Sequence, residues 1–339
     1  MSAELDYPFS DPPAAGTLCC VAPGIHWLRL ALPWRLDHIN LWLLDDTAGP
    51  VLVDTGLGDE ATRTAWGHWL DSAPQGLSRI LVTHYHPDHL GNAAWLAART
   101  GAPVAMALGE LLLAHAVWAQ LPGFDAPAML AQFRSHGLSE ELLARLAGRG
   151  NIYKRGVPEL PGQIQRLSDG DELHIGGRSW RAISGQGHSP EHLAFHCAEA
   201  GVLIAGDMLL PRISTHVSVA PALPEEDAVG RYLASVQRFS ALPEDTLVLP
   251  AHGLPFRGLH ARIGQLMAHH VSRDARMCAA LQQATHAAGL LDTLFQRELD
   301  AHQLMFAMSE AIAHLNHATA GGRLCRLVSP DGLIRYQAC

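Results

Sequence analysis

The sequence carries little positive charge, and nearly all of that charge is arginine. Lys154 is the single lysine among 339 residues, and the formal net charge at pH 7 is −9. Electrostatic affinity for nucleic acid grows with the number of phosphates that basic side chains neutralise. The charge balance therefore argues against a general nucleic-acid-binding protein.

Cysteine motifs and long apolar runs are also missing. The six cysteines are scattered without a Cys-x-x-Cys spacing, which argues against a structural zinc site or a redox pair. No apolar run reaches the roughly 18 residues that cross a membrane. Residues 1–13 hold acids and prolines in place of the basic start and apolar core of a signal peptide. We therefore expect no membrane partner and a cytoplasmic location.

What the sequence does contain is a dense group of metal-binding side chains in residues 83–89, Thr-His-Tyr-His-Pro-Asp-His. The apolar residues 79–82 before it predict a buried strand, and residues 90–98 after it predict the start of a helix. The group would then lie at the carboxyl end of a strand, where open α/β sheets place their sites. In an extended segment His84 and His86 point to the same side and can bind one ion. Asp88 and His89 can reach a second ion at the turn into the helix.

Imidazole and carboxylate ligands suit zinc, and manganese or iron can use the same set. With 21 histidines in the chain, a chance cluster is more common than usual. The full His-x-His-x-Asp-His pattern directly after an apolar strand nevertheless favours a metal site.

This pattern resembles the signature of the metallo-β-lactamase-fold hydrolases, and the resemblance extends along most of residues 20–256. It implies an α/β fold, an αββα sandwich with a one- or two-metal hydrolytic site at one edge. Residues 187–192, Gly-His-Ser-Pro-Glu-His, resemble the Gly-His-Thr-Pro-Gly-His of the family. His188 would supply the third imidazole of the first metal, and His192 would support the site without binding metal. Glu191 replaces the usual glycine, which leaves the geometry of that turn open.

Three further positions follow from the same resemblance. Asp207, after the apolar residues 201–205, resembles the aspartate that bridges the two metals, although it could simply be a turn residue. His252, after residues 246–249, matches the last ligand. Asp54 would orient the ligand histidines, or it could merely form a turn before Gly56. The resemblance thus assigns His84, His86 and His188 to one ion, assigns Asp88, His89 and His252 to the other, and places Asp207 between them.

The hydrophobic patterns predict two groups of strands and a helical tail. The first strands are expected at residues 25–32, 38–44, 51–53, 79–82, 102–106 and 164–167, and the later ones at 173–175, 180–183, 201–205 and 246–249. Helices are expected at residues 60–70, 225–240, 262–284, 293–299 and 303–317, and a hairpin at 323–328 and 333–337. We interpret residues 1–257 as a catalytic domain with a helical insertion at about 109–150. Residues 258–339 resemble the winged-helix tail of many family members.

The resemblance implies chemistry in which two divalent ions, Zn²⁺ by default and Fe or Mn as alternatives, share a hydroxide that attacks the substrate. Asp88 or Asp207 would carry the proton. We expect a hydrolase of small-molecule carboxylic esters, thioesters or lactones, like the glyoxalase II and lactonase branches. Two alternatives stay open: a phosphodiesterase or endoribonuclease of the same fold, and a non-catalytic binding or regulatory protein. Arg212 or His216 could meet a substrate anion. Apolar stripes on the tail helices could dock onto the catalytic domain or form a homodimer.

Overall fold

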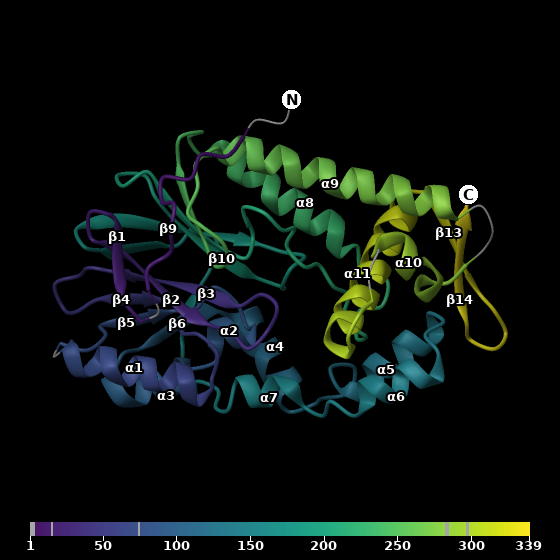
Figure 1. Cartoon of the computed structure of the whole chain (residues 1–339), viewed down its shortest axis with the longest axis horizontal. Coiled ribbons are helices and arrows are strands. Elements are labelled where there is room, and N and C mark those ends of the chain that lie inside the picture. Colours follow the sequence, from purple (N-terminus) through teal and green to yellow (C-terminus); the bar gives the residue numbers. More distant parts are fainter. Residues whose placement is uncertain (1–3, 15, 74, 282–284, 296–297) are drawn as a thin grey trace.

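The computed structural model describes residues 4–14, 16–73, 75–281, 285–295 and 298–339. Two β-sheets lie face to face, with helices on their outer faces and a largely helical region beside them (Figure 1). The expected αββα sandwich is confirmed. None of the helices in these ranges is long and apolar enough to cross a membrane.

The first sheet has seven strands in chain order. They are β1 (Leu18–Ala22), β2 (Ile25–Ala31), β3 (His38–Leu44), β4 (Val51–Val53), β5 (Arg79–Leu81), β6 (Val104–Ala107) and β7 (Gln165–Leu167). Strands β1 to β4 pair antiparallel, and β4 to β7 pair parallel. Helices α1 (Glu60–Ser72) and α3 (Ala93–Thr100) cover the outer face (Figure 1). A short helix, α2 (Pro87–Leu90), lies between β5 and α3.

The second sheet has the order β12-β11-β10-β9-β8. Its strands are β8 (Glu172–Ile175), β9 (Arg178–Gly185), β10 (His192–Cys197), β11 (Val202–Gly206) and β12 (Leu247–Pro250). Helix α8 (Ala228–Arg238), which leads into the single turn η1 (Phe239–Ala241), packs on this sheet from outside. Buried aromatic residues such as Trp27, Trp42, Trp180 and Phe195 fill the space between the sheets. Burying one such side chain stabilises the fold by about 3 kcal/mol, so this layer holds the two sheets together.

Four helices separate β6 from β7, in the region where we expected a helical insertion. They are α4 (Leu108–Trp118), α5 (Ala126–Ser135), α6 (Glu140–Ala147) and α7 (Ile152–Gly156). Asp125, Ser139 and Asn151 each accept a hydrogen bond from a backbone N–H in the first turn of α5, α6 and α7. These caps explain why an alanine- and leucine-rich stretch breaks into several short helices.

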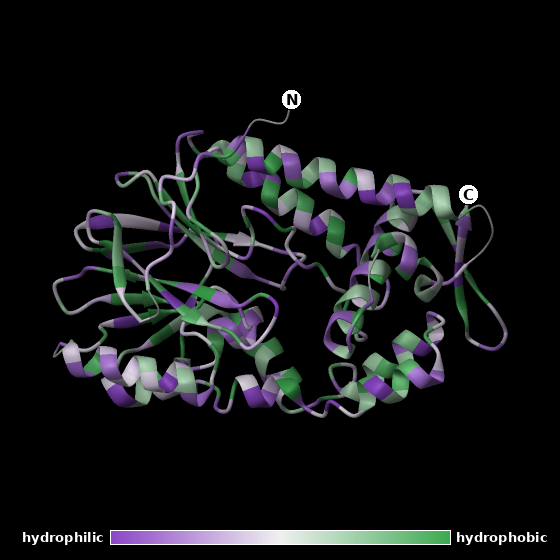
Figure 2. Ribbon diagram, viewed as in Figure 1, coloured by the Kyte–Doolittle hydropathy of each residue, from purple (hydrophilic) through white to green (hydrophobic). Residues whose placement is uncertain are grey.

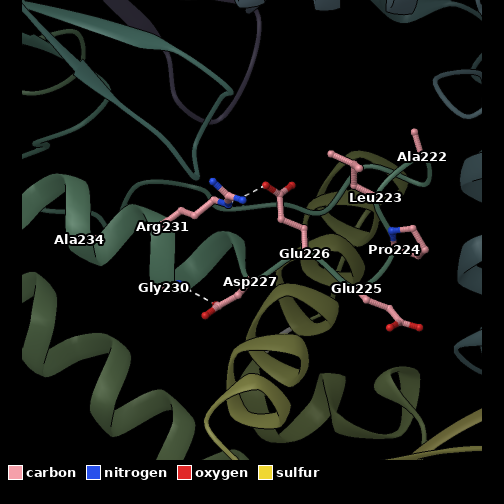
Figure 3. A pocket seen from close by; sticks show the side chains of 9 residues that line it. All are labelled: Ala222, Leu223, Pro224, Glu225, Glu226, Asp227, Gly230, Arg231 and Ala234. Atoms are coloured by element: carbon pink, nitrogen blue, oxygen red, sulfur yellow. Dashed lines mark hydrogen bonds and ion pairs between the residues drawn. The ribbon is translucent and has the colours of Figure 1, made fainter. Parts of the chain in front are cut away.

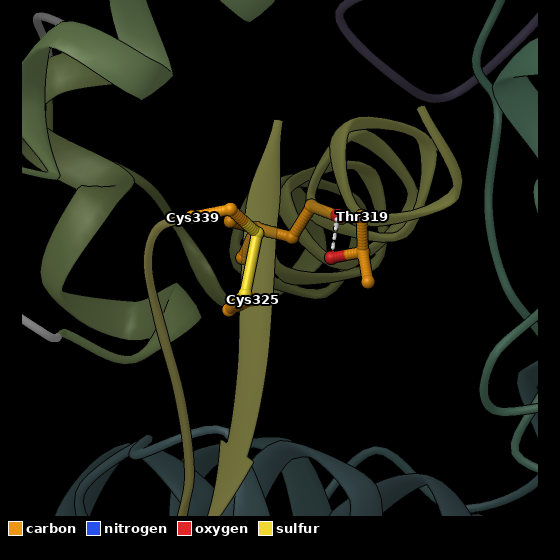
Figure 4. The surroundings of a disulfide bond; sticks show 4 residues. Thr319, Cys325 and Cys339 are labelled. Carbon is orange, nitrogen blue, oxygen red and sulfur yellow. Dashed lines mark hydrogen bonds between the residues drawn. A yellow bond between two sulfur atoms is a disulfide. The ribbon is translucent and has the colours of Figure 1, made fainter. Parts of the chain in front are cut away.

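The tail begins with α9 (Leu259–Ala280) and ends with α11 (Ala301–Ala320) and the hairpin of β13 (Leu324–Val328) and β14 (Ile334–Ala338). Between them lie η2 (Ala287–Leu290) and α10 (Leu291–Leu294). The tail helices carry hydrophobic and hydrophilic residues side by side in Figure 2, as expected for helices with one buried face. Cys325 and Cys339 form a disulfide within the hairpin region, a pairing that the cysteine spacing did not predict (Figure 4).

Several expected boundaries were wrong. The expected helix at 293–299 is not continuous: α10 ends at Leu294, Phe295 is extended, and residues 298–300 are not helical, while residues 296–297 lie outside the described residues. The next helix starts at Ala301, since Asp300 is extended and caps it by accepting from Gln303. Helix α9 ends at Ala280, and the expected residues 282–284 lie outside the described residues. Strands β1 and β10 were not anticipated.

Candidate metal centre

The candidate metal-binding side chains lie where strands of both sheets end. His84 and His86 lie between β5 and α2, and Asp88 and His89 lie within α2. Asp207 follows β11 and His252 follows β12. His188 lies in the loop that connects β9 to β10. Strands β4 and β5 run parallel, and so do β11 and β12, so the carboxyl ends within each pair lie side by side. The fold thereby gathers side chains that are more than 160 residues apart in the sequence.

The first group consists of His84, His86, His188 and Asp207. His84 Nε2 lies 2.9 Å from His86 Nδ1 and 3.1 Å from His188 Nε2. His188 Nε2 lies 3.4 Å from Asp207 Oδ2. Two nitrogen ligands of one tetrahedral zinc ion are roughly 3.3 Å apart, so this spacing suits a single ion. Burial holds the pKa of His84 and of His86 well below the ordinary value, which keeps both rings neutral and able to bind a cation.

The second group consists of Asp88, His89 and His252, with Asp207 beside it. Asp207 Oδ1 lies 3.6 Å from His89 Nε2 and 3.4 Å from His252 Nε2. Asp88 Oδ2 lies 3.7 Å and 3.4 Å from the same two nitrogens. Asp207 therefore turns one carboxylate oxygen toward each group, which is the arrangement that a bridging ligand requires.

Two buried atoms of this centre support a metal role. His89 Nε2 and Asp207 Oδ1 have no hydrogen-bond partner in the part of the chain that the structure describes. Buried polar atoms nearly always have a partner, so two unpaired atoms whose lone pairs can point into one shared space suit a site that a cation completes. The residues present thus fit a pair of divalent ions.

The charge balance around His89 leads to the same conclusion. Burial opposes a charge on this ring, but Asp54, Asp88 and Asp207 together raise its pKa to about 10. Burial would also raise the pKa of Asp207, yet His252 and His89 hold it well below the usual range. The carboxylates thus hold a proton on His89, and a bound cation would displace it.

Three of the candidate ligand histidines, His89, His188 and His252, are oriented by contacts at Nδ1. His89 Nδ1 is 2.8 Å from the Asp54 carboxylate, which also accepts from the Thr83 backbone N–H at 2.8 Å. His188 Nδ1 donates to the His216 carbonyl at 2.6 Å, and His252 Nδ1 donates to the His38 carbonyl at 2.7 Å. These contacts leave the three Nε2 atoms facing the centre. The predicted orienting role of Asp54 agrees with this geometry, and its left-handed φ of 62° places the carboxylate there.

The position of Asp207 is fixed from behind by His192 and Thr215. The Asp207 backbone N–H donates to His192 Nε2 at 3.2 Å, and the Thr215 hydroxyl donates to the Asp207 carbonyl at 2.5 Å. Gly206 permits this approach, because a Cβ there would lie 2.4 Å from His192 Nε2. His192 thus contacts the backbone of Asp207 and belongs to neither group.

Glu110 is a functional candidate that the sequence analysis missed. It is fully buried on α4, and its carboxylate accepts from the Tyr85 backbone N–H at 2.9 Å, the Ser189 hydroxyl at 2.7 Å and the Glu191 backbone N–H at 2.7 Å. Burial raises its pKa to about 7. Glu110 therefore ties the loop of His84 and His86 to the loop of His188.

Glu191, which replaces the usual glycine, also connects the His188 loop to α4. Its carboxylate accepts from the Gly109 backbone N–H at 2.9 Å, at the start of α4. The first backbone N–H groups of a helix have no partner within the helix and favour a negative charge. The substitution therefore pins the His188 loop to α4 a second time.

The two suggested anion contacts have other partners. The Arg212 guanidinium is exposed and lies 5.6 Å from the ring centre of Tyr7. The carbonyl of His216 accepts from His188, and its ring packs against Phe306 with 4.5 Å between ring centres. A shallow groove elsewhere, lined by residues 222–227 and α8, is acidic, but its Glu226 is paired with Arg231 (Figure 3). Its other acids are also paired, Glu225 with Arg326 and Asp227 with His317.

Comparisons with known proteins agree with this geometry. The family described as "Metallo-beta-lactamase superfamily" matches residues 34–252, and "Metallo-beta-lactamase-like, C-terminal domain" matches residues 275–339. A crystal structure of a beta-lactamase domain protein from Burkholderia ambifaria is 44% identical with a TM-score of 0.92, covering 99% of this chain and 98% of that one.

Among curated relatives, a thioesterase of Emericella nidulans is 25% identical over 75% of this chain and 56% of its own length. A hydroxyacylglutathione hydrolase of Pseudomonas entomophila is 27% identical over 66% of this chain and 64% of its own. The chain spans about three fifths of the length of the curated relatives that it matches first.

Proposed function

Because the chain belongs to the metallo-β-lactamase superfamily of hydrolases, we propose that it cleaves carboxylic esters, thioesters or lactones with two divalent ions bound by its seven clustered side chains. The observation that carries this proposal is the placement of Asp207, with one oxygen toward His188 and the other toward His89 and His252. A single shared carboxylate brings two cations together and offsets part of their charge. The nitrogen and oxygen ligands suit Zn²⁺, and Fe or Mn fit the same set.

When bound, such ions polarise the substrate carbonyl and lower the pKa of water from 15.7 to about 7. The chain supplies the rest. His84, His86 and His188 would bind one ion, and Asp88, His89 and His252 would bind the other. Asp88 and Asp207 keep carboxylate oxygens at the centre, where either can accept a proton from the attacking water and return it to the leaving group. Asp54, His192 and Glu110 hold these groups in position through hydrogen bonds.

Acyl substrates are favoured over phosphodiesters by the relatives, two of which are named for thioester or acylglutathione hydrolysis. The acidic chain offers little that would neutralise many phosphates. The complete set of seven clustered metal-binding side chains favours an enzyme over a non-catalytic binding protein.

The proposal is tested by supplying Zn²⁺, Mn²⁺ or Fe²⁺ to metal-stripped protein and assaying a panel of thioesters, lactones and a model phosphodiester. We expect turnover of at least one acyl substrate, lost on chelation and restored by metal. Turnover of the phosphodiester alone would move the protein to the phosphodiesterase alternative. No turnover of any substrate by fully loaded protein would favour a binding role.

A further inference from the structure

The first two turns of α11 place aromatic side chains beside the candidate metal centre. The ring of His302 stacks on Trp34 with 5.9 Å between ring centres and 18° between planes. On its other side His302 packs edge-on against Phe306 at 4.8 Å, and Phe306 packs edge-on against His216 at 4.5 Å. We call these four residues the aromatic row. All four residues are half-buried.

The His216 end of the aromatic row adjoins the metal centre. The carbonyl of His216 accepts from His188 of the first group. Trp34 lies in the loop that ends at His38, whose carbonyl accepts from His252 of the second group and whose ring lies 6.1 Å from that of His252. The row therefore runs from the loop before His38 to His216, and only its middle members come from the tail.

His302, one of the two histidines of the row, stays an uncharged ring. Arg149 Nη2 donates to His302 Nδ1 at 2.5 Å, which places the ring proton on Nε2. Burial and the adjacent Arg149 both lower the pKa of His302. His302 is thus a neutral aromatic surface at pH 7. The Arg149 guanidinium forms no ion pair among the described residues. The Arg149 backbone carbonyl accepts a hydrogen bond from the Arg155 side chain.

We propose that the aromatic row binds an aromatic ring in the acyl group of the substrate, so that the preferred substrates are arylacyl esters or thioesters. This inference rests on the proposed function. Aromatic rings favour offset-stacked or edge-on partners with centres about 4.5–7 Å apart, and both arrangements already occur within the row. A substrate ring seated there would lie beside His216 and would present its acyl carbon to the adjoining metal centre.

The kinetic test compares the S-benzoyl and S-acetyl thioesters of N-acetylcysteamine. One aromatic contact changes an affinity by about 2- to 12-fold. We expect Phe306→Ala and Phe306→Leu to raise KM for the benzoyl substrate about 10-fold, with kcat within about twofold. KM for the acetyl substrate should stay within about twofold. The leucine variant keeps the apolar volume, so it reports on the ring even if the alanine variant folds poorly.

The matched control is Trp95→Ala, because Trp95 is a half-buried aromatic residue on α3 that contacts Arg63 and Arg99 instead of the row. This variant should leave KM and kcat for both substrates unchanged. A phenacyl thioether of N-acetylcysteamine, which cannot be hydrolysed, separates this inference from the proposed function. Calorimetry should show it binding to wild-type protein and about 10-fold more weakly to Phe306→Leu, whether or not thioesters are cleaved. Equal effects on benzoyl and acetyl substrates, or unchanged thioether binding in Phe306→Leu, would overturn the proposal.

Discussion

At the scale of single residues, the site depends on how Asp207 divides its two oxygens between the histidine groups. The backbone of Asp207 is held by His192 and Thr215, so the carboxylate has little freedom to turn away. The side chain lies at the centre of a buried cluster in which burial keeps His84 and His86 neutral. Its negative charge is therefore the property that a bridging role needs.

Replacing Asp207 tests that role. We expect Asp207→Asn, which keeps the shape and loses the charge, to reduce kcat/KM at least 100-fold and to release one or both ions. Asp207→Ala should do the same while the circular dichroism spectrum stays native. Asp169→Asn is a matched control, because Asp169 forms a surface ion pair with Arg238. Full metal content and near-normal turnover in Asp207→Asn would show that Asp207 does not bridge.

The sequence predicts those residues of the metal centre that belong to short, local motifs. His84, His86, Asp88 and His89 share one short segment after an apolar strand, and the structure brings them together with His188, Asp207 and His252. Glu110 has no such motif, because an acid in the first turn of a helix ordinarily faces solvent. Its partners lie 25 to 81 residues away, and only the tertiary fold shows that it is buried.

At the scale of elements, α4 holds the two histidine loops through Glu110 and the N–H of Gly109. All three groups that face the Glu110 carboxylate donate hydrogen bonds to it. Glutamine has a single acceptor oxygen, and its amide nitrogen would face one of these donors.

We therefore expect Glu110→Gln to lower the free energy of unfolding by about 1–3 kcal/mol and to weaken metal binding, since it leaves a buried donor unpaired. Thermal unfolding and metal titration measure the two effects. Glu141→Gln, at an exposed position of α6, is the control. An unchanged melting temperature together with unchanged metal affinity in Glu110→Gln would contradict the assigned role of α4.

Helix α9 carries a buried histidine whose ionisation opposes folding. His270 packs against His314 and Tyr232 with 5.2 and 5.4 Å between ring centres, and neither of its nitrogens has a partner among the described residues. Burial, with a contribution from His314, lowers its pKa to about 3. Between pH 6.5 and 3 the unfolded chain binds a proton that the folded chain does not, so acid favours unfolding in this range.

His270→Phe should accordingly make stability less dependent on pH. From pH 6.5 to 4.5 the wild-type protein should lose about 2 kcal/mol through this residue, and the variant should lose less. Melting temperatures across that range provide the measurement, with His68→Gln at an exposed position of α1 as control. Parallel curves for wild type and His270→Phe would show that His270 is not held neutral.

Element prediction succeeded where periodicity was regular and failed where polar residues or caps intervened. The sequence Gly176-Gly177 predicted the β8–β9 hairpin. In the structure both glycines adopt the positive φ that a tight turn needs. Strand β10 was missed, since His192 and His196 disguise a strand that is buried along its whole length. Strand β1 was missed because it is an edge strand with no fully buried residue.

At the scale of the whole molecule, the tail is continuous with the catalytic region. Leu304, Met308 and Ile312 of α11 belong to the same apolar cluster as Leu203 of β11 and Val248 of β12. The apolar stripes that the sequence predicted on the tail helices are therefore internal, which favours docking onto the catalytic region over a homodimer. The division at residues 257 and 258, and the winged-helix resemblance, stay predictions.

The tail should not bind nucleic acid. Residues 259–339 hold seven arginines, no lysine and six acids, a formal balance of +1. Arg273, Arg323 and Arg326 are already paired with Glu310, Asp274 and Glu225. Few cations are left to neutralise phosphates. Fluorescence anisotropy with generic RNA and duplex DNA at about 150 mM salt should show no binding at micromolar protein. Micromolar affinity that falls steeply with salt would favour the ribonuclease alternative.

The metal content of the purified protein tests the central claim most directly. Seven side chains in two converging groups, with an unpaired His89 Nε2 and Asp207 Oδ1 between them, predict two divalent ions per chain. Protein prepared without chelator and supplied with Zn²⁺ should approach two ions per chain by elemental analysis. A value that stays at one would leave the second group without a metal role. A value of zero after metal is supplied would contradict the whole account of the site.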